Sequence, residues 1–291
     1  MKMDVSVALG AVIQGVMMGA IYGLIGLGIT MVFAVTGMLN FAHGDFMSLA
    51  MYLCLALHTA FNLDPYLSLF VTVPAFFVLG LLLYHFFFRR TLKAEILMVV
   101  QLTLGMVFII ENGVLMVFGP DYRSVPNFLL TTVVSMGDMF AVRGTYLVTF
   151  LVGGAVGFGL YWLIESTDLG RQIRAIAQDR EAAQLMGVNV ARVQMLIFAI
   201  GIALLGLAGP LLTSILTMEP YFGLHLTLFA FITFVMGGVG NFLGTLIAGY
   251  ILGVTESMGM LYLGGYYGAA VPYAIFVLLL IFRPHGILGT K

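Results

Sequence analysis

Long apolar runs, separated by short polar segments, follow one another along the whole chain. This pattern predicts spans near residues 8–34, 41–60, 66–88, 95–118, 145–164 and 194–216. A further apolar stretch, 223–260, is interrupted by a glycine-rich segment at 237–241, so it holds either two spans or one span and a re-entrant pair; the last span lies near 267–282. Continuous rather than alternating runs exclude a barrel. We therefore expect an all-α, polytopic transmembrane helix bundle with eight or nine spans.

Composition supports a membrane solvent. Hydrophobic residues make up 62% of the 291 positions and charged residues only 9%, whereas a soluble domain carries about 25% charged residues. The longest polar insertion, 165–193, is too short to bury a core of its own. We expect one transmembrane domain covering 1–291, with 165–193 as a loop between spans.

Positively charged residues predict the orientation, because they concentrate in cytoplasmic loops. A nine-span reading places nine of them on one side: Arg89, Arg90, Lys93, Arg171, Arg174, Arg180, Arg192, Arg283 and Lys291. It leaves only Lys2, Arg123 and Arg143 on the other side. The nine-span reading is favoured for this reason, with the N-terminus periplasmic and the C-terminus cytoplasmic.

Residues for enzymatic chemistry are missing from the sequence. The phosphate-binding pattern G-x-x-x-x-G-K-[ST] does not occur, the one cysteine is Cys54, and no His, Cys or Glu cluster has metal-ligand spacing. The net charge of −1 gives no indication of nucleic-acid binding. We expect a membrane protein with no catalytic residue, metal or cofactor of its own.

The polar loop 165–193 is expected to form two short helices. Thr167 or Asp168 can cap the first helix. Asp179 can cap the second, which covers 180–186 and ends at Gly187 as its C′ residue. Two capped helices lying across a membrane face would make a rigid lever.

Polar side chains inside apolar runs are candidates for a solute path, because they are costly in lipid. Asn40 and His43 share a helix face three residues apart, and Asp45 follows them. Thr36-Gly37 just before them can interrupt a helix, which would leave this element within the membrane as a discontinuous segment. The element either contacts the solute or holds helices together through a buried polar network.

Three further polar residues fall inside predicted spans. Glu111 and Asn112 lie in the fourth span, and Glu256 lies late in the eighth. Each is a candidate for the solute path or for a contact within or between subunits. Glycines in the first span, Gly19, Gly23, Gly26 and Gly28, are better explained by close helix contact.

The loop carries a family resemblance. Glu181-Ala182-Ala183, followed by Gly187, matches the E-A-A-x-x-x-G loop of ABC-importer permeases. In that family the loop docks in a cleft of the ATPase subunit. The resemblance implies coupling to an ATPase through six residues: Asp179, Arg180, Glu181, Ala182, Ala183 and Gly187.

Four islands then resemble the shorter, H-type permeases for branched-chain amino acids. They are Asn40-Phe41-Ala42-His43-Gly44-Asp45-Phe46, the loop segment 178–190, Gly237-Gly238-Val239-Gly240-Asn241, and the tail Arg283-Pro284-His285-Gly286-Ile287-Leu288-Gly289. They spread over essentially the whole chain. Asn241 departs mildly from the family, where serine is more usual.

The resemblance implies an inner-membrane importer for leucine, isoleucine and valine. Its other parts are a second related permease subunit, two cytoplasmic ATPase subunits that bind the ATP, and a periplasmic substrate-binding protein. Permeases for urea and short amides share these motifs, so such a solute is an alternative. A self-sufficient secondary transporter is another alternative, against which the E-A-A-x-x-x-G loop argues.

Overall fold

The computed structural model describes residues 5–92, 94–136 and 140–289. Lys2, Lys93 and Lys291, which the charge argument used, lie outside these residues. The described helices are α1 (Val5–Thr36), α2 (His43–Phe61), α3 (Pro65–Leu83), α4 (Arg89–Thr91), α5 (Ile96–Phe118), α6 (Gly144–Ser166), α7 (Asp168–Gln178), α8 (Arg180–Leu185), α9 (Val190–Thr213), α10 (Phe222–Gly237), α11 (Phe242–Leu263), α12 (Gly265–Gly268) and α13 (Val271–Phe282). A π-helical turn, Tyr84–Phe88, joins α3 to α4.

The helix bundle confirms the predicted fold class. Seven of the described helices are long and apolar enough to cross a membrane: α1, α2, α3 with its continuation to Thr91, α5, α6, α9 and α11. Two shorter apolar helices, α10 and α13, have 16 and 12 residues. At 1.5 Å per residue they rise about 24 and 18 Å, less than the hydrocarbon core. Nine crossings therefore stay a prediction.

Two sequence expectations are corrected. The stretch near 267–282 was expected to be one span, but α12 ends at Gly268 and α13 begins only at Val271, with Pro272 in its first turn. Proline is accepted there because the first amides of a helix have no intrahelical partner. No element was predicted between the spans 95–118 and 145–164, whereas this segment contains an antiparallel hairpin, β1 (Val133–Met136) and β2 (Phe140–Arg143).

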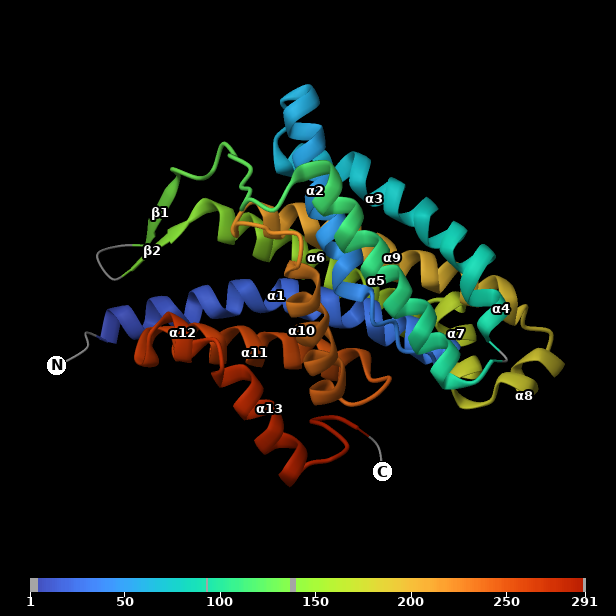
Figure 1. Ribbon diagram of the computed structural model, residues 1–291. Helices are drawn as coiled ribbons and strands as arrows, with labels where there is room; N and C mark the ends of the chain where they lie inside the picture. Colours follow the sequence, from blue (N-terminus) through green and yellow to red (C-terminus); the bar gives the residue numbers. More distant parts are fainter. Residues whose placement is uncertain (1–4, 93, 137–139, 290–291) are drawn as a thin grey trace.

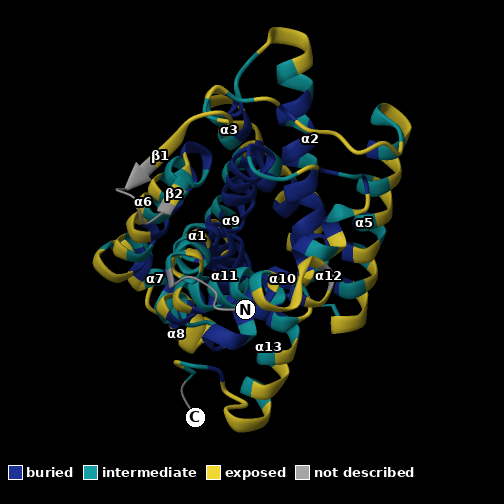
Figure 2. Cartoon of the chain, turned by 90° about the vertical axis from the view of Figure 1, so that its left-hand side faces the viewer, coloured by how far each residue is buried: buried dark blue, intermediate teal, exposed yellow. Residues whose placement is uncertain are grey.

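α1 forms the centre of the bundle. It packs against α11, α9, α6 and α10, and Figure 2 shows α1, α9 and α2 largely buried while α5 and α13 are exposed at the periphery. Gly15 and Gly19 of α1 face Gly253 and Gly249 of α11, so the two helices run antiparallel. A Cβ on Gly19 would lie 2.6 Å from the Cα of Tyr250. The predicted role of the first-span glycines in close helix contact is thereby confirmed at this seam.

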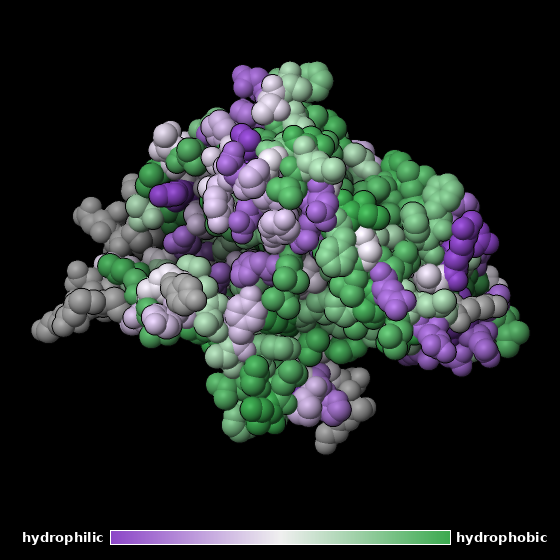
Figure 3. All heavy atoms as spheres, in the orientation of Figure 1, coloured by the Kyte–Doolittle hydropathy of each residue, from purple (hydrophilic) through white to green (hydrophobic). Residues whose placement is uncertain are grey.

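The two ends of the bundle differ. Figure 1 shows α4, α7 and α8 at one end, and β1, β2, α12 and the N-terminus at the other. In Figure 3 hydrophilic side chains gather over the α7–α8 end and also over the upper part of the face nearer the hairpin, with hydrophobic side chains between the two groups. Arg123 and Arg143 lie toward the hairpin end, in the connection from α5 to α6. This arrangement agrees with the grouping of charges in the sequence.

Candidate functional site

The two short helices α7 and α8 form where the sequence predicts them, and their first turns are capped by the predicted side chains. The Thr167 hydroxyl accepts a hydrogen bond from the Gly170 amide at the start of α7. Asp179 Oδ1 accepts from the amides of Glu181 and Ala182, at 2.9 and 3.0 Å, and so caps α8. These bonds satisfy amides that the first helical turn leaves free.

The end of α8 is equally well defined. Gly187 adopts φ +87°, in the left-handed region where a Cβ is strained. Its amide donates to the Gln184 carbonyl, and the Val188 amide donates to the Ala183 carbonyl. This is the Schellman arrangement. The predicted C′ role of Gly187 is confirmed, with α8 ending one residue earlier than expected.

α8 presents most of its surface outward. Asp179, Arg180, Glu181 and Ala182 are exposed, and Ala183 alone turns inward, onto the cluster formed by α7 and α9. Leu185 and Met186 are 89% and 85% exposed. A rigid helix that holds two large apolar side chains in water is typical of a docking element.

The Asn-His element folds back alongside α1. After Thr36 the chain turns at Gly37, with φ +68°, and α2 begins at His43. The Nε2 atom of His43 lies 3.1 Å from the carbonyl oxygen of Ile25. Ile25 is eleven residues before the end of α1, which corresponds to about 16 Å along the helix. The predicted discontinuity is therefore real, and α2 begins deep within the bundle.

Asp45 lies in the first turn of α2, packed against the start of α10. A Cβ on Gly223 would lie 2.0 Å from its Oδ1, and the neighbouring Gly44 amide donates to Thr227 Oγ1 at 2.9 Å. Asp45 is 1% exposed, and neither carboxylate oxygen has a hydrogen-bond partner among the described residues. Asn40 Nδ2 and His43 Nδ1 are likewise buried and unpartnered there. Such groups are rare in helix bundles, because each loses its hydration without compensation.

The remaining candidates separate. Glu111 of α5 is partly buried and close enough to Asp45 for an electrostatic interaction. Asn112 is exposed and donates to the Phe108 carbonyl of its own helix at 2.7 Å. Glu256 of α11 is buried and accepts a hydrogen bond from Tyr22 of α1. The structure thus places Asn40, His43 and Asp45 together at the start of α2, with Glu111 on the neighbouring helix α5, and leaves Asn112 and Glu256 in other surroundings.

Sequence reasoning missed several residues that build these contacts. Tyr22 supplies the donor to Glu256, while Gly223 and Thr227 form the floor under Asp45. Gln194 joins three elements, because its amide donates to the Val35 carbonyl and its carbonyl accepts from Tyr84. Only Gln194 carried a signal, as a lone amide in an apolar run.

Two of the sequence islands meet at the α7–α8 side of the bundle. The turn 238–241 between α10 and α11 packs on the tail, with Asn241 Nδ2 donating to the Leu288 carbonyl at 2.8 Å. The Ile287 amide donates to the Met236 carbonyl at 2.8 Å. A Cβ on Gly286 would lie 2.6 Å from the Gly238 nitrogen. Close backbone packing therefore explains why this pair of islands is rich in glycine.

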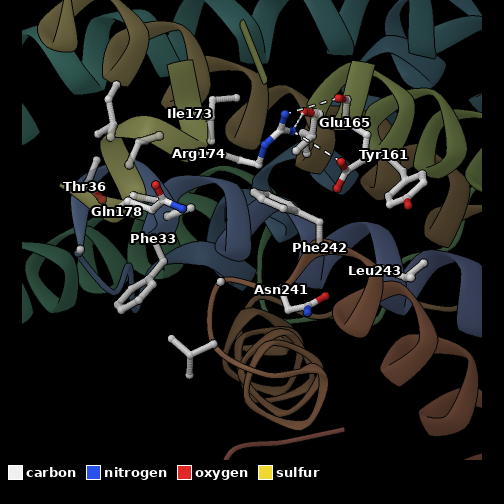
Figure 4. Close-up of a pocket in the computed structure, with 18 of the residues that line it drawn as sticks. Phe33, Thr36, Tyr161, Glu165, Ile173, Arg174, Gln178, Asn241, Phe242 and Leu243 are labelled. Atoms are coloured by element: carbon white, nitrogen blue, oxygen red, sulfur yellow. Dashed lines mark hydrogen bonds and ion pairs between the residues drawn. The ribbon is translucent and has the colours of Figure 1, made fainter. Parts of the chain in front are cut away.

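Beside this turn lies a cavity of about 930 Å³. Figure 4 shows it between the end of α1 with Phe33 and Thr36, α6 with Tyr161, α7 with Arg174, and the start of α11. Arg174 pairs with Glu165 and donates to the Ile164 carbonyl, which fixes α7 to the end of α6. The cavity thus separates α7 from the turn 238–241.

Long apolar helices, a buried polar element and a short exposed helix at one end are together typical of integral membrane permeases. Residues 11–280 match the family described as branched-chain amino acid transport system / permease component. The chain belongs to this family.

Named relatives agree with this assignment. The chain is 31% identical, over 95% of its length and 94% of the relative, to the high-affinity branched-chain amino acid transport system permease protein LivH of Salmonella typhimurium. It is 30% identical to the corresponding protein BraD of Pseudomonas aeruginosa, with the same coverage. It is also 28% identical, over 77% of its length and 71% of the relative, to the ribose import permease protein RbsC of Haemophilus influenzae. No solved structure matches the chain.

Proposed function

We propose that this chain is the membrane-spanning subunit of an ATP-driven importer that moves leucine, isoleucine and valine across the bacterial inner membrane. The observation that carries the proposal is the family match over residues 11–280, together with relatives named for branched-chain amino acid transport. The similarity to ribose import permeases indicates that this architecture serves more than one solute. The identity to the amino acid permeases covers 95% of the chain, whereas the identity to the ribose permease covers 77%, and this difference favours amino acids as the solute.

α8 is the proposed coupling helix. Its capped ends make it a rigid unit, and the exposed Leu185 and Met186 offer an apolar knob for a cleft in an ATPase subunit. Because the sequence holds no phosphate-binding loop, ATP is hydrolysed by the partner. Binding of ATP there would stabilise one of two packings of the bundle through α8 and α7.

The proposed assembly has five chains: this subunit, a related permease, two cytoplasmic ATPases and a periplasmic binding protein. The clustering of Arg171, Arg174 and Arg180 at the α7–α8 end supports a cytoplasmic position for that end. The hairpin end would then face the periplasm and receive the loaded binding protein.

Expression with the neighbouring genes, followed by purification and reconstitution, tests the proposal. We expect a second permease and two ATPase chains to co-purify, and leucine-loaded binding protein to raise ATPase activity. Stimulation by urea or an amide instead would change the solute and keep the architecture. Purification alone, with solute uptake that needs no ATP, would replace the proposal with a secondary transporter.

Two variants test the coupling role directly. Glu181→Arg places a like-signed, larger group on the exposed face of α8 beside Arg180, and Gly187→Pro removes the left-handed C′ residue and its amide. Both should abolish ATP-driven uptake while the protein remains in the membrane. Normal uptake by both variants would disprove the coupling assignment.

A further inference from the structure

α2 and α5 pack side by side in register. Tyr52 of α2 and Phe118 of α5 have ring centroids 5.0 Å apart, and Asp45 of α2 interacts electrostatically with Glu111 of α5. α2 and α5 pack against each other, and Asp45 and Glu111 each lie seven residues before the ring of their own helix, so parallel helices would bring the two carboxylates to the same level of the seam between them. The seam reaches from the deep start of α2 to the loop that follows α5.

One face of α2 lines this seam with polar groups. Asp45, Ser48 and Tyr52 follow one another at helical spacing and share a face. Each is 1% exposed, and the side-chain oxygens of all three are buried without a partner among the described residues. Desolvated oxygens of this kind are destabilising unless another group satisfies them. Because the three side chains lie along one face of α2, their unpartnered oxygens indicate one common function.

The described part of the chain offers no cation to the two carboxylates. The ion pairs among the described residues use Arg123, Arg171 and Arg174, all away from this pair. The wall behind Asp45 is the backbone of α10 at Gly223, which leaves no room for a side chain. Two neighbouring carboxylates inside a membrane require a proton or a cation from elsewhere.

Glu111 lies at the edge of the seam, and the seam extends toward one end of the molecule. Glu111 is only partly buried, and its neighbours Phe108 and Ile109 on α5 are 63% and 73% exposed. At the other extreme, Tyr52 lies within electrostatic range of Arg123 and Glu219 in the loops after α5 and α9. Tyr52 and Ser48 therefore lie between those loops and the carboxylate of Asp45 along α2.

We propose that Asp45 and Glu111 form a binding site for the protonated amine of the translocated solute, with the Ser48 hydroxyl as a third acceptor. An ammonium group presents three hydrogen-bond donors and one positive charge, which matches two carboxylates and one hydroxyl. Urea and amides carry no such charge and would leave the pair uncompensated. The proposal deepens the proposed function, because it restricts the solutes to those with a protonated amine.

Thermal unfolding of the purified complex tests the site without any need for transport. The probe is isopentylammonium chloride, which carries the leucine side chain and the ammonium but no carboxylate, and isopentanol is its neutral counterpart. The ammonium should raise the Tm of the wild-type complex by about 3 °C or more at saturation, whereas isopentanol should not. Asp45→Asn and Glu111→Gln should lose the shift, and Glu111→Asp, which keeps the charge, should retain most of it.

Thr72→Val is the matched control. Thr72 of α3 is also buried with an unpartnered hydroxyl, but it packs against α9 at Gly206, away from the seam. This variant should keep the full shift. An absent shift in the wild type, an equal shift in Asp45→Asn, or the same shift from sodium chloride would overturn the ammonium site.

Leucine uptake in liposomes separates this proposal from the broader one. Asp45→Asn and Glu111→Gln should lower uptake roughly tenfold, the effect of about 1.4 kcal/mol at the barrier, whereas Thr72→Val should leave uptake near the wild-type level. Wild-type leucine uptake that these variants leave intact would overturn the site and keep the importer. Ammonium binding by a complex that takes up no leucine would keep the site and overturn the proposed solute.

Discussion

The hydroxyl of Tyr22 donates a hydrogen bond of 2.6 Å to Oε2 of Glu256, joining α1 to α11 across 234 residues of sequence. Glu256 is 9% exposed, and Tyr22 also stacks on Phe229 of α10 with ring centroids 4.8 Å apart. A buried acid in this bundle is therefore held by a neutral donor rather than by an arginine or lysine. The contact ties three helices together at one point.

Replacing Tyr22 by phenylalanine tests this tie. Tyr22→Phe keeps the ring and removes the donor, which leaves Glu256 buried without it and should lower stability by about 1–3 kcal/mol. Thermal unfolding in detergent measures the loss. Tyr273→Phe serves as the comparison, because its longer contact of 3.3 Å to His225 should matter less. Equal effects of the two substitutions would argue against a special role for the Tyr22 bond.

The glycine seam between α1 and α11 should tolerate no added methyl group. A Cβ on Gly249 would lie 2.3 Å from the backbone nitrogen of Gly23, so Gly249→Ala must push the helices apart. We expect a loss of about 1–3 kcal/mol, as for other overpacked interiors. The measurement is the unfolding temperature of the membrane-extracted protein.

Gly159→Ala is the matched control for the seam. Gly159 lies inside α6, is exposed, and has no atom within 4 Å of an added Cβ. Alanine is the better helix former, so this variant should be neutral or more stable by up to about 1 kcal/mol. A loss of stability as large as that of Gly249→Ala would show that the close approach is not the cause.

The cap of α8 should influence coupling more than overall stability. Asp179→Ala removes the acceptor for two amides and should weaken the short helix by about 1 kcal/mol, whereas Asp179→Asn keeps an acceptor. Uptake per ATP hydrolysed should fall in the alanine variant and stay near wild type in the asparagine variant. Identical coupling ratios in both would mean that the cap is dispensable.

Gln194 should be the most sensitive amide in the bundle. Gln194→Leu leaves the Val35 carbonyl and the Tyr84 hydroxyl without their partner and should cost about 1–3 kcal/mol. Gln101→Leu, at an exposed position of α5, is the control and should change stability by less than about 0.5 kcal/mol. Urea or thermal unfolding of the two variants gives the comparison.

Local signals predicted the parts of this structure that depend on local physics. Span positions follow from runs of apolar residues, and the ends of α7 and α8 follow from the capping chemistry of Thr167, Asp179 and Gly187. The break before α2 was also predicted, from Thr36-Gly37. These features need only neighbours in the sequence.

Features that depend on distant partners were not predictable in this way. The floor of Gly223 and Thr227 under Asp45 comes from a helix about 180 residues away, and neither residue type is unusual in a span. The division between α12 and α13 and the β1–β2 hairpin lay in stretches whose composition suited a span and a loop. The separation of Asn112 and Glu256 from the Asp45 group is likewise a matter of helix rotation, which apolar periodicity inside a membrane specifies poorly.

The antiparallel seam between α1 and α11 also constrains how the protein is made. α1 leaves the ribosome first, but the glycines that receive it, Gly249 and Gly253, are more than 200 residues behind. During synthesis the narrow face of α1 is therefore without its partner until α11 has been translated. A nascent chain that stops short of α11 would present that face to other membrane proteins. α11 therefore protects the glycine face of α1 from incorrect contacts during biogenesis.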